Sequence, residues 1–222
     1  MKIGLIGGIG PAATLFYYDR LSKAFAARGQ DLELVIVNAS TRTLTENVSA
    51  GRIKEQAQVF LAVAKQLAAA GADCVVISSM GGHFCIDEFE PVCPLPIIHG
   101  PRAVGNHLKR TGITNPGVLG TRVVMETGLY GFLKELNPVI PGTESIAQVH
   151  QDYIDMAMAG APTADQRHRL LQAGNTLIDK QGASVILLGG TDLSLVYDEN
   201  TDVPFIDTAQ IHVDAIVAQA LN

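Results

Sequence analysis

The chain of 222 residues has no tryptophan, only three cysteines, 5% aromatic residues and no low-complexity tract. No apolar run approaches the roughly 18 residues that cross a bilayer. Lys and Arg total 16 against 22 Asp and Glu, a net charge of -6, and the basic residues form no stripe. These absences argue against a membrane partner and a nucleic-acid partner. We therefore expect a soluble, cytoplasmic protein, and the hydrophobic content of 47% is enough for a sizeable core.

The three cysteines, Cys74, Cys85 and Cys93, lie within twenty residues of one another. An odd number so close together does not indicate a disulfide framework, so we expect reduced, mostly buried thiols. His83 with Cys85 and Cys93 could in principle hold a metal ion. No fourth ligand follows at the spacing of a zinc site, and we expect no metal.

Three segments of the chain recur in the same order. The separations are 113, 111 and 108 residues, nearly constant, which indicates two similar halves. The matching pairs are IGLIGG (3–8) with PGVLGT (116–121), GADCVVISS (71–79) with GASVILLGG (182–190), and LPIIHG (95–100) with VPFIDT (203–208).

Apolar runs alternate with helical patterns in both halves, which is typical of parallel sheets covered by helices on both faces. We expect a strand in LELVIVNAS, a loop at 40–43, a long helix over 48–71, a helix near 124–136, a strand near 145–149 and helix over 151–181.

The pattern predicts an α/β fold of two pseudo-symmetric, doubly wound parallel-sheet lobes, with the site in the cleft between them. The first lobe is expected to comprise residues 1–100 plus 209–222, and the second residues 101–208. Functional residues should then follow the carboxyl ends of the strands.

The first strand runs into the loop GGIGPAAT, which opens a helix. Gly8, Gly10 and Ala13 nearly satisfy a dinucleotide fingerprint, but the second strand ends in Asn38-Ala39-Ser40 without the acidic residue that binds ribose. We therefore expect no nicotinamide cofactor. Backbone N–H groups at Gly8, Ile9 and Gly10 could bind a carboxylate, although the loop could also be a simple tight turn.

Arg42 follows the second strand and could bind a carboxylate through two N–H groups, or it could be solvated. The third strand ends at Ser79, with Met80, Gly81 and His83 beyond it. His83 could contact a ligand or only pack.

In the second half, Thr121 follows the first strand, and Gly190, Thr191 and Asp192 follow the next one. By spacing, Ser79 corresponds to Gly190. Asp192 could contact a substrate or cap a short helix.

The chain resembles the aspartate/glutamate racemase family, the cofactor-independent amino-acid racemases. The resemblance covers nearly the whole chain and lies in IGLIGGIGP, ADCVVISSMGGHF, GVLGTRVVMETGLY, LLGGTDLSLV and VPFIDTAQIH. It implies a homodimer that acts without pyridoxal phosphate on a small acidic amino acid. Two cysteines, one in each paired loop, would exchange the α-proton on opposite faces of the substrate.

This chain departs from that pattern at both positions, because Ser79 and Gly190 stand where the resemblance expects the thiols. A hydroxyl is a much weaker base than a thiolate, and glycine carries no proton. A basic residue expected for the distal carboxylate is also missing near Pro162, where Arg167 or Arg169 could substitute.

Three functions therefore remain open. The first is a racemase-like isomerase in which Ser79, His83, Gly190 and Asp192 mark the catalytic loops. The second is a lyase, decarboxylase or isomerase that needs a proton on one side only. The third is a non-catalytic binder of small carboxylates. In all three, the expected binding residues are Gly8, Ile9, Gly10, Arg42, Met80, Gly81, Thr121 and Thr191.

Overall fold

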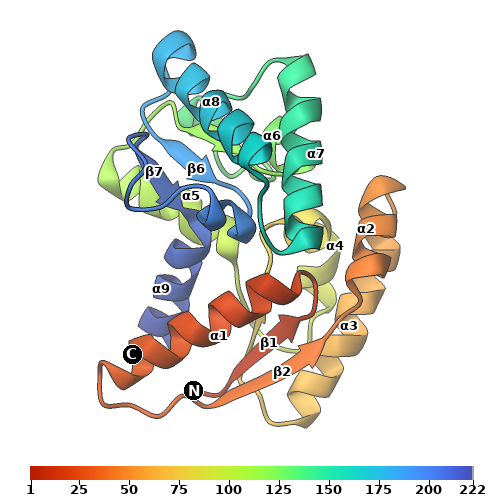
Figure 1. The fold of residues 1–222 in the computed structure, drawn as a ribbon. Coiled ribbons are helices and arrows are strands. Elements are labelled where there is room, and N and C mark those ends of the chain that lie inside the picture. Colours follow the sequence, from red (N-terminus) through yellow and green to blue (C-terminus); the bar gives the residue numbers. More distant parts are fainter. Residues whose placement is uncertain (222) are drawn as a thin grey trace. The chain divides into compact units, whose positions relative to one another are not determined.

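A computed structural model describes residues 1–221. The chain folds into two compact units, the first made of Met1–Gly100 with the chain from His212 onward, the second of Pro101–Ile211. Each unit is built on its own parallel sheet (Figure 1). Within the described chain, no helix has the length and apolar character needed to span a membrane.

The first unit contains a four-stranded sheet in the order β2-β1-β3-β4. Its strands are β1 (Ile3–Gly7), β2 (Leu34–Asn38), β3 (Cys74–Ile77) and β4 (Ile97–Ile98). All pairs are parallel, with Ile3 aligned to Leu34 on one side and to Cys74 on the other. Every residue of β1 and β3 is buried, as expected for central strands covered on both faces.

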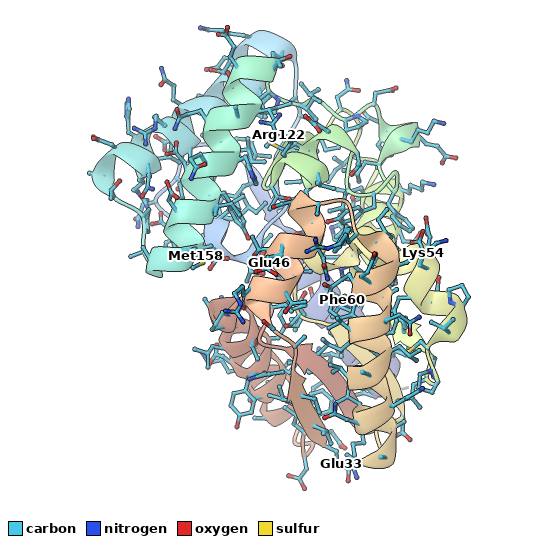
Figure 2. All side chains as sticks on the ribbon, turned by 90° about the vertical axis from the view of Figure 1, so that its right-hand side faces the viewer. Glu33, Glu46, Lys54, Phe60, Arg122 and Met158 are labelled. Carbon is cyan, nitrogen blue, oxygen red and sulfur yellow. The ribbon has the colours of Figure 1, made fainter. Side chains whose placement is uncertain are left out.

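Helices cover both faces of this sheet. Ile6, Val75 and Ile77 belong to a core shared with helix α3 (Ile53–Ala69). Phe60, which Figure 2 labels on α3, meets the Phe89 ring edge-on in this core, with the ring centroids 5.6 Å apart. Helices α1 (Pro11–Ala26) and α9 (Thr208–Ala220) lie side by side in Figure 1, on the other face. The remaining elements are α2 (Thr41–Ser49), the 3-10 turn η1 (Gly81–Cys85), α4 (Ile86–Phe89) and η2 (Glu90–Val92).

The loop expected at 40–43 is wrong, because α2 begins at Thr41. Ser40 caps this helix by accepting a hydrogen bond from the Thr43 N–H at 3.2 Å. The long helix expected over 48–71 is shorter, since Gly51 takes a left-handed conformation (φ 63°) that separates α2 from α3.

The second unit contains a three-stranded parallel sheet in the order β5-β6-β7. Its strands are β5 (Gly117–Leu119), β6 (Ile186–Leu188) and β7 (Phe205–Asp207). This order repeats that of β1, β3 and β4, and the matching strands lie in the three segments that recur in the sequence. The prediction of an α/β fold with two parallel sheets is confirmed.

The helices of the second unit differ from the expected ones. The prediction of a strand near 145–149 is wrong, since these residues lie inside α7 (Thr143–Ala159). The helical region expected over 151–181 is broken at Gly160 (φ 76°), and α8 (Ala164–Gln181) follows. The counterpart of β2 is a single bridge, in which Val139 pairs with Gly117. The other elements are α5 (Gly100–Thr111), α6 (Arg122–Glu126), η3 (Lys134–Leu136) and η4 (Thr191–Leu195).

Candidate functional site

In the first unit, three loops meet at the carboxyl ends of β1, β2 and β3. The Gly8 N–H donates to the Thr14 hydroxyl at 2.9 Å, and this hydroxyl lies 3.5 Å from that of Ser78. Thr41, the first residue of α2, donates its hydroxyl to the Gly8 carbonyl. These side-chain bonds hold the predicted site residues of this unit in one region of the sheet.

The loop after β1 presents the open N-terminus of α1. Gly10 precedes the helix with φ 112° and ψ 93°, Pro11 is its first residue, and no side chain caps it. The N–H groups and dipole of a 16-residue helix favour an anion at this end. Ile9 is 3% exposed and packs in the core, so only its backbone is available to a ligand.

Arg42 lies in the first turn of α2, next to Thr41, with its side chain exposed. Its side chain makes no ion pair or hydrogen bond with any residue between 1 and 221. The guanidinium is therefore free to pair with a carboxylate or to remain solvated, and α2 starts at the Gly8 loop.

The loop after β3 is held by His83. The Ser79 carbonyl accepts from the Gly82 N–H at 3.1 Å and from His83 Nδ1 at 2.9 Å. The Ser79 side chain is half-buried, and its hydroxyl makes no hydrogen bond within the described chain. Met80 is 1% exposed, which makes it a packing residue rather than a ligand contact. Gly81 has room for a side chain, because the nearest atom to an added Cβ is the Ser79 hydroxyl at 3.6 Å.

His83 belongs to a buried cluster of three histidines. Its ring centroid lies 5.1 Å from that of His99 and 6.0 Å from that of His212. His212 donates from Nε2 to the Ile98 carbonyl at 2.8 Å, so its Nδ1 accepts from the Tyr17 hydroxyl, also at 2.8 Å. Burial lowers the pKa of His212 to about 4 and that of His83 well below its ordinary value. Both rings are therefore neutral at pH 7, and the His83 ring is bound to the Ser79 carbonyl.

In the second unit, helix α7 covers the ends of β5 and β6. Thr121 caps α6 by accepting from the Val124 N–H at 3.4 Å, and the next N–H, that of Arg122, donates to His150 Nδ1 at 3.2 Å. Burial is the main cause that lowers the pKa of His150, followed by the charge of Arg122. Since Nδ1 is the acceptor, the neutral ring carries its proton on Nε2.

Tyr153 lies in α7, three residues after His150, and covers the end of β6. Its hydroxyl donates to Asp192 Oδ2 at 3.2 Å, and its ring lies over Gly190. Burial and the nearby Asp192 raise the pKa of Tyr153 well above its ordinary value, and burial raises that of Asp192. Thr191 and Asp192 are each 7% exposed, and the Thr191 carbonyl accepts from the Ser194 hydroxyl at 2.8 Å.

His150 and Tyr153 were not predicted as site residues, because the functional residues were sought only in the loops that follow the strands. Their spacing of three residues places them on one face of a helix, which would have been a usable signal. Tyr130 is a further neighbour, since its phenol interacts electrostatically with that of Tyr153. It belongs to a left-handed turn, Gly128–Gly131, in which all four residues have φ between 55° and 81°. Such a run is rare outside glycine and marks a constrained segment.

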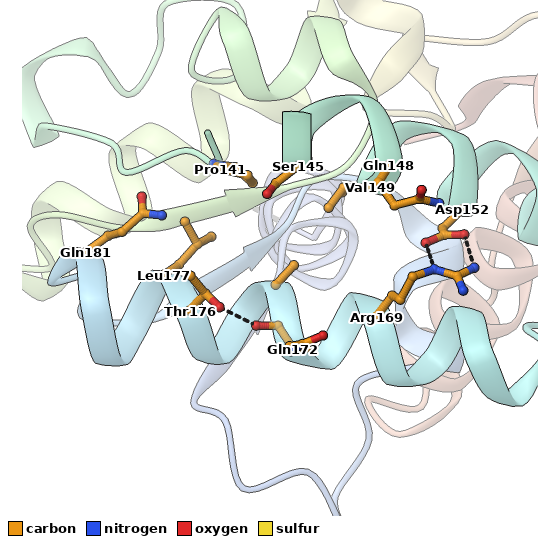
Figure 3. Close-up of a pocket in the computed structure, with 11 residues that line it drawn as sticks. Pro141, Ser145, Gln148, Val149, Asp152, Arg169, Gln172, Thr176, Leu177 and Gln181 are labelled. Atoms are coloured by element: carbon orange, nitrogen blue, oxygen red, sulfur yellow. Dashed lines mark hydrogen bonds and ion pairs between the residues drawn. The ribbon is translucent and has the colours of Figure 1, made fainter. Parts of the chain in front are cut away.

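Arg167 and Arg169 are held by carboxylates of their own unit. Arg167 donates to Asp198 and to the Leu195 carbonyl. Arg169 binds both oxygens of buried Asp152, at 2.6 and 2.8 Å, beside a groove of about 320 Å³ between α7 and α8 (Figure 3). The groove thus contains no unpaired guanidinium for a substrate carboxylate.

The three cysteines lie at other positions than the loop residues Ser79 and Gly190. Cys74 begins β3, and Cys85 is buried in η1, where burial raises the pKa of its thiol to about 12. Cys93 is half-buried, and burial raises its pKa as well. Among residues 1–221, no group of three His, Cys, Asp or Glu side chains is arranged to hold a metal ion.

Comparison with known proteins places these features in a family. The sequence pattern of the Asp/Glu/hydantoin racemase family matches residues 6–216. A candidate Asp/Glu racemase from Yersinia pestis is 27% identical with a TM-score of 0.87, and each chain is fully covered. An aspartate racemase homologue from Pyrococcus horikoshii shares the fold at 22% identity and a TM-score of 0.80, covering 100% of this chain and 99% of its own.

The glutamate racemase of Francisella tularensis, solved in complex with D-glutamate, also shares the fold. Its TM-score is 0.68 at 13% identity, with 99% of this chain and 81% of the other covered. With nearly its whole length matched by the family pattern, the chain belongs to the Asp/Glu/hydantoin racemase family.

Proposed function

We propose that the protein is a cofactor-independent enzyme of the racemase type, which binds a small acidic amino acid or a related carboxylate and exchanges the proton on its α-carbon. Family membership and the D-glutamate complex of a relative with this fold support the substrate class. The observation that carries the proposal is the set of loops at the ends of β1, β2 and β3, with an open helix N-terminus, an unpaired Arg42 and an unpaired Ser79 hydroxyl.

Each group has a role in this proposal. The N–H groups at the start of α1 bind the α-carboxylate, and Arg42 binds a second carboxylate. Ser79 lies at the α-carbon, oriented through its carbonyl by His83. Thr121 and Thr191 are the ligand-binding residues proposed for the second unit. A homodimer is also expected from the family resemblance, and sedimentation equilibrium would measure it.

Ser79 and Gly190 take the places of two thiols in this proposal, so the chain cannot use a thiolate as its base. Cys85 does not supply this thiolate, because burial raises the pKa of its thiol to about 12 and the thiol stays protonated at neutral pH. A slower reaction through hydroxyl groups is therefore expected.

The weak acidity of hydroxyl groups also favours a second candidate function, a binder without turnover. A one-sided reaction, catalysed by a lyase or decarboxylase on the same scaffold, would be compatible with a single proton donor.

The test is to incubate the protein with the L and D forms of aspartate and glutamate in deuterated water. NMR would follow α-proton exchange and chirality, with binding measured by calorimetry in parallel. We expect the wild type to exchange the α-proton. Arg42→Gln should slow this exchange by weakening substrate binding, and Ser79→Ala should lower its rate with binding little changed. Exposed Arg28, which donates to the Ala24 carbonyl on α1, provides the control Arg28→Gln. Binding without exchange would identify the non-catalytic binder instead, and neither binding nor exchange would refute both candidates.

A further inference from the structure

The end of β6 carries a proton donor that comes from another element. Gly190 has no side chain, and the space above it is filled by the end of the Tyr153 side chain. A Cβ added to Gly190 would lie 2.5 Å from Cε2 and Cζ of that ring and closer still to its hydroxyl. The phenol therefore occupies the place that a side chain of residue 190 would take.

We infer that Tyr153 is the catalytic acid that the second unit supplies, delivering a proton to the α-carbon of a small carboxylate bound at the end of β6. This inference rests on the proposed function for its substrate class, and it adds the group that Gly190 lacks. Sites in doubly wound folds lie beyond the carboxyl ends of the strands, where the Tyr153 hydroxyl is found.

The surroundings of Tyr153 fit a positioned donor. Its hydroxyl is held by Asp192 Oδ2 at 3.2 Å, and Asp192 is itself 7% exposed in the turn that begins at Thr191. The constrained left-handed turn at Gly128–Gly131 places Tyr130 in electrostatic contact with the same phenol. Because burial and Asp192 raise the pKa of Tyr153, the phenol keeps its proton at neutral pH and serves as an acid.

The step is a proton transfer. The Tyr153 O–H bond breaks, its proton goes to the carbanionic α-carbon, and the electron pair on that carbon forms the new C–H bond. The phenolate then regains a proton from water. The carbanion forms beforehand, when the base of the proposed function takes the α-proton and the electron pair of that C–H bond stays on the α-carbon. Asp192 is a positioning residue here, because it orients the hydroxyl without touching the substrate.

The test uses Tyr153→Phe, which removes the hydroxyl and keeps the ring over Gly190. Its matched control is Tyr18→Phe, which removes a hydroxyl from a side chain of α1 that is 52% exposed. L-aspartate and D-aspartate are incubated separately in deuterated water with each variant, and with Ser79→Ala. We expect Tyr153→Phe to lose at least 100-fold in the conversion of one enantiomer into the other, with binding changed less than threefold. Ser79→Ala should lose exchange, as the proposed function expects, and Tyr18→Phe should match the wild type.

The outcomes separate this inference from the proposed function. Interconversion of the enantiomers by Tyr153→Phe at the wild-type rate would overturn the role of Tyr153 and leave the proposed function standing. Binding of aspartate without exchange by the wild type would overturn it too, whereas neither binding nor exchange would refute the proposed function and this inference together. Asp192→Asn provides a second readout, because a positioning role predicts a changed pH profile of exchange with KM nearly constant.

Discussion

The loops after β3 and β6 occupy equivalent places in the two sheets, yet they are built in opposite ways. After β3, a buried imidazole holds the backbone from within the unit and leaves the Ser79 hydroxyl open. After β6, the loop has no side chain at Gly190, and a phenol from α7 fills the space. A repeated strand order therefore fixes where the functional groups lie, whereas the residues that reach those places differ between the units.

Among the predicted changes, acid should lower the free energy of unfolding most, and it should act through the buried histidines of the loop region in the first unit. His212 has a pKa of about 4 in the folded protein against about 6.5 when unfolded. Between these values the unfolded chain binds more protons, so stability is complete above pH 6.5 and falls as the pH drops towards 4. We expect a loss on the order of 3 kcal/mol in the free energy of unfolding from this residue.

Urea unfolding at pH 7 and pH 4 would measure this loss. His212→Gln cannot titrate, so its stability should depend less on pH than that of the wild type. His168→Gln, at an exposed position of α8, serves as the control and should keep the wild-type dependence. An equal pH dependence in His212→Gln would contradict the prediction.

Adding a methyl group to each loop should have the next largest effect. Gly190→Ala places a Cβ against the Tyr153 ring and should cost about 1–3 kcal/mol, as overpacking does. In Gly81→Ala, the added Cβ lies 3.6 Å from the Ser79 hydroxyl, an ordinary contact, so the free energy of unfolding should change by less than about 0.5 kcal/mol. Denaturant titration of both variants would measure the difference.

Two further variants would sharpen this comparison. Gly142→Ala, also in the second unit, has no atom within 4 Å of the added Cβ, so it controls for the collision and loses only the preference for glycine at the N-cap of α7. Combining Gly190→Ala with Tyr153→Ala removes the collision, so the two changes should be less than additive. Full additivity would show that Tyr153 does not occupy the space over Gly190.

Helix capping should have an intermediate effect in the first unit. Ser40→Ala removes the acceptor of the Thr43 N–H at the start of α2, which should cost about 1 kcal/mol. Because Arg42 lies in that first turn, hydrogen exchange of residues 41–44 should also increase. Ser49→Ala, an exposed change at the other end of the helix, should leave both measurements unchanged.

Removing the Asp192 charge should have the smallest effect on stability, with a sign opposite to that of the histidines. The pKa of Asp192 is raised in the folded protein, so its contribution is greatest at low pH and is lost as the pH rises. Asp192→Asn keeps an acceptor for Tyr153 and removes the buried charge. We expect a gain below about 1 kcal/mol at pH 7 that disappears at pH 4, measured by thermal unfolding. A loss of stability at pH 7 would contradict this expectation.

The sequence was sufficient to predict the two parallel sheets, because each central strand is a short apolar run in a repeated order. The loops that follow these strands could also be located, among them Gly8–Gly10, Ser79 and Gly190. The contribution of α7 could not: residues 145–149 were read as a strand, and nothing in the sequence connects the part of the helix that was expected with the loop at Gly190. Tyr153 lies 37 residues before Gly190 in the sequence, and only tertiary packing shows that one fills the space above the other.

The single bridge at Val139 has a consequence for self-association. Val139 accepts from the Val118 N–H at 2.9 Å and donates to the Pro116 carbonyl at 2.8 Å, which occupies the outer side of β5. Pro138 and Pro141 flank this bridge and lack the N–H groups that a longer ladder would need. A foreign strand therefore meets these two groups of the β5 edge already paired, and the short segment protects this edge of the smaller sheet against edge-to-edge aggregation.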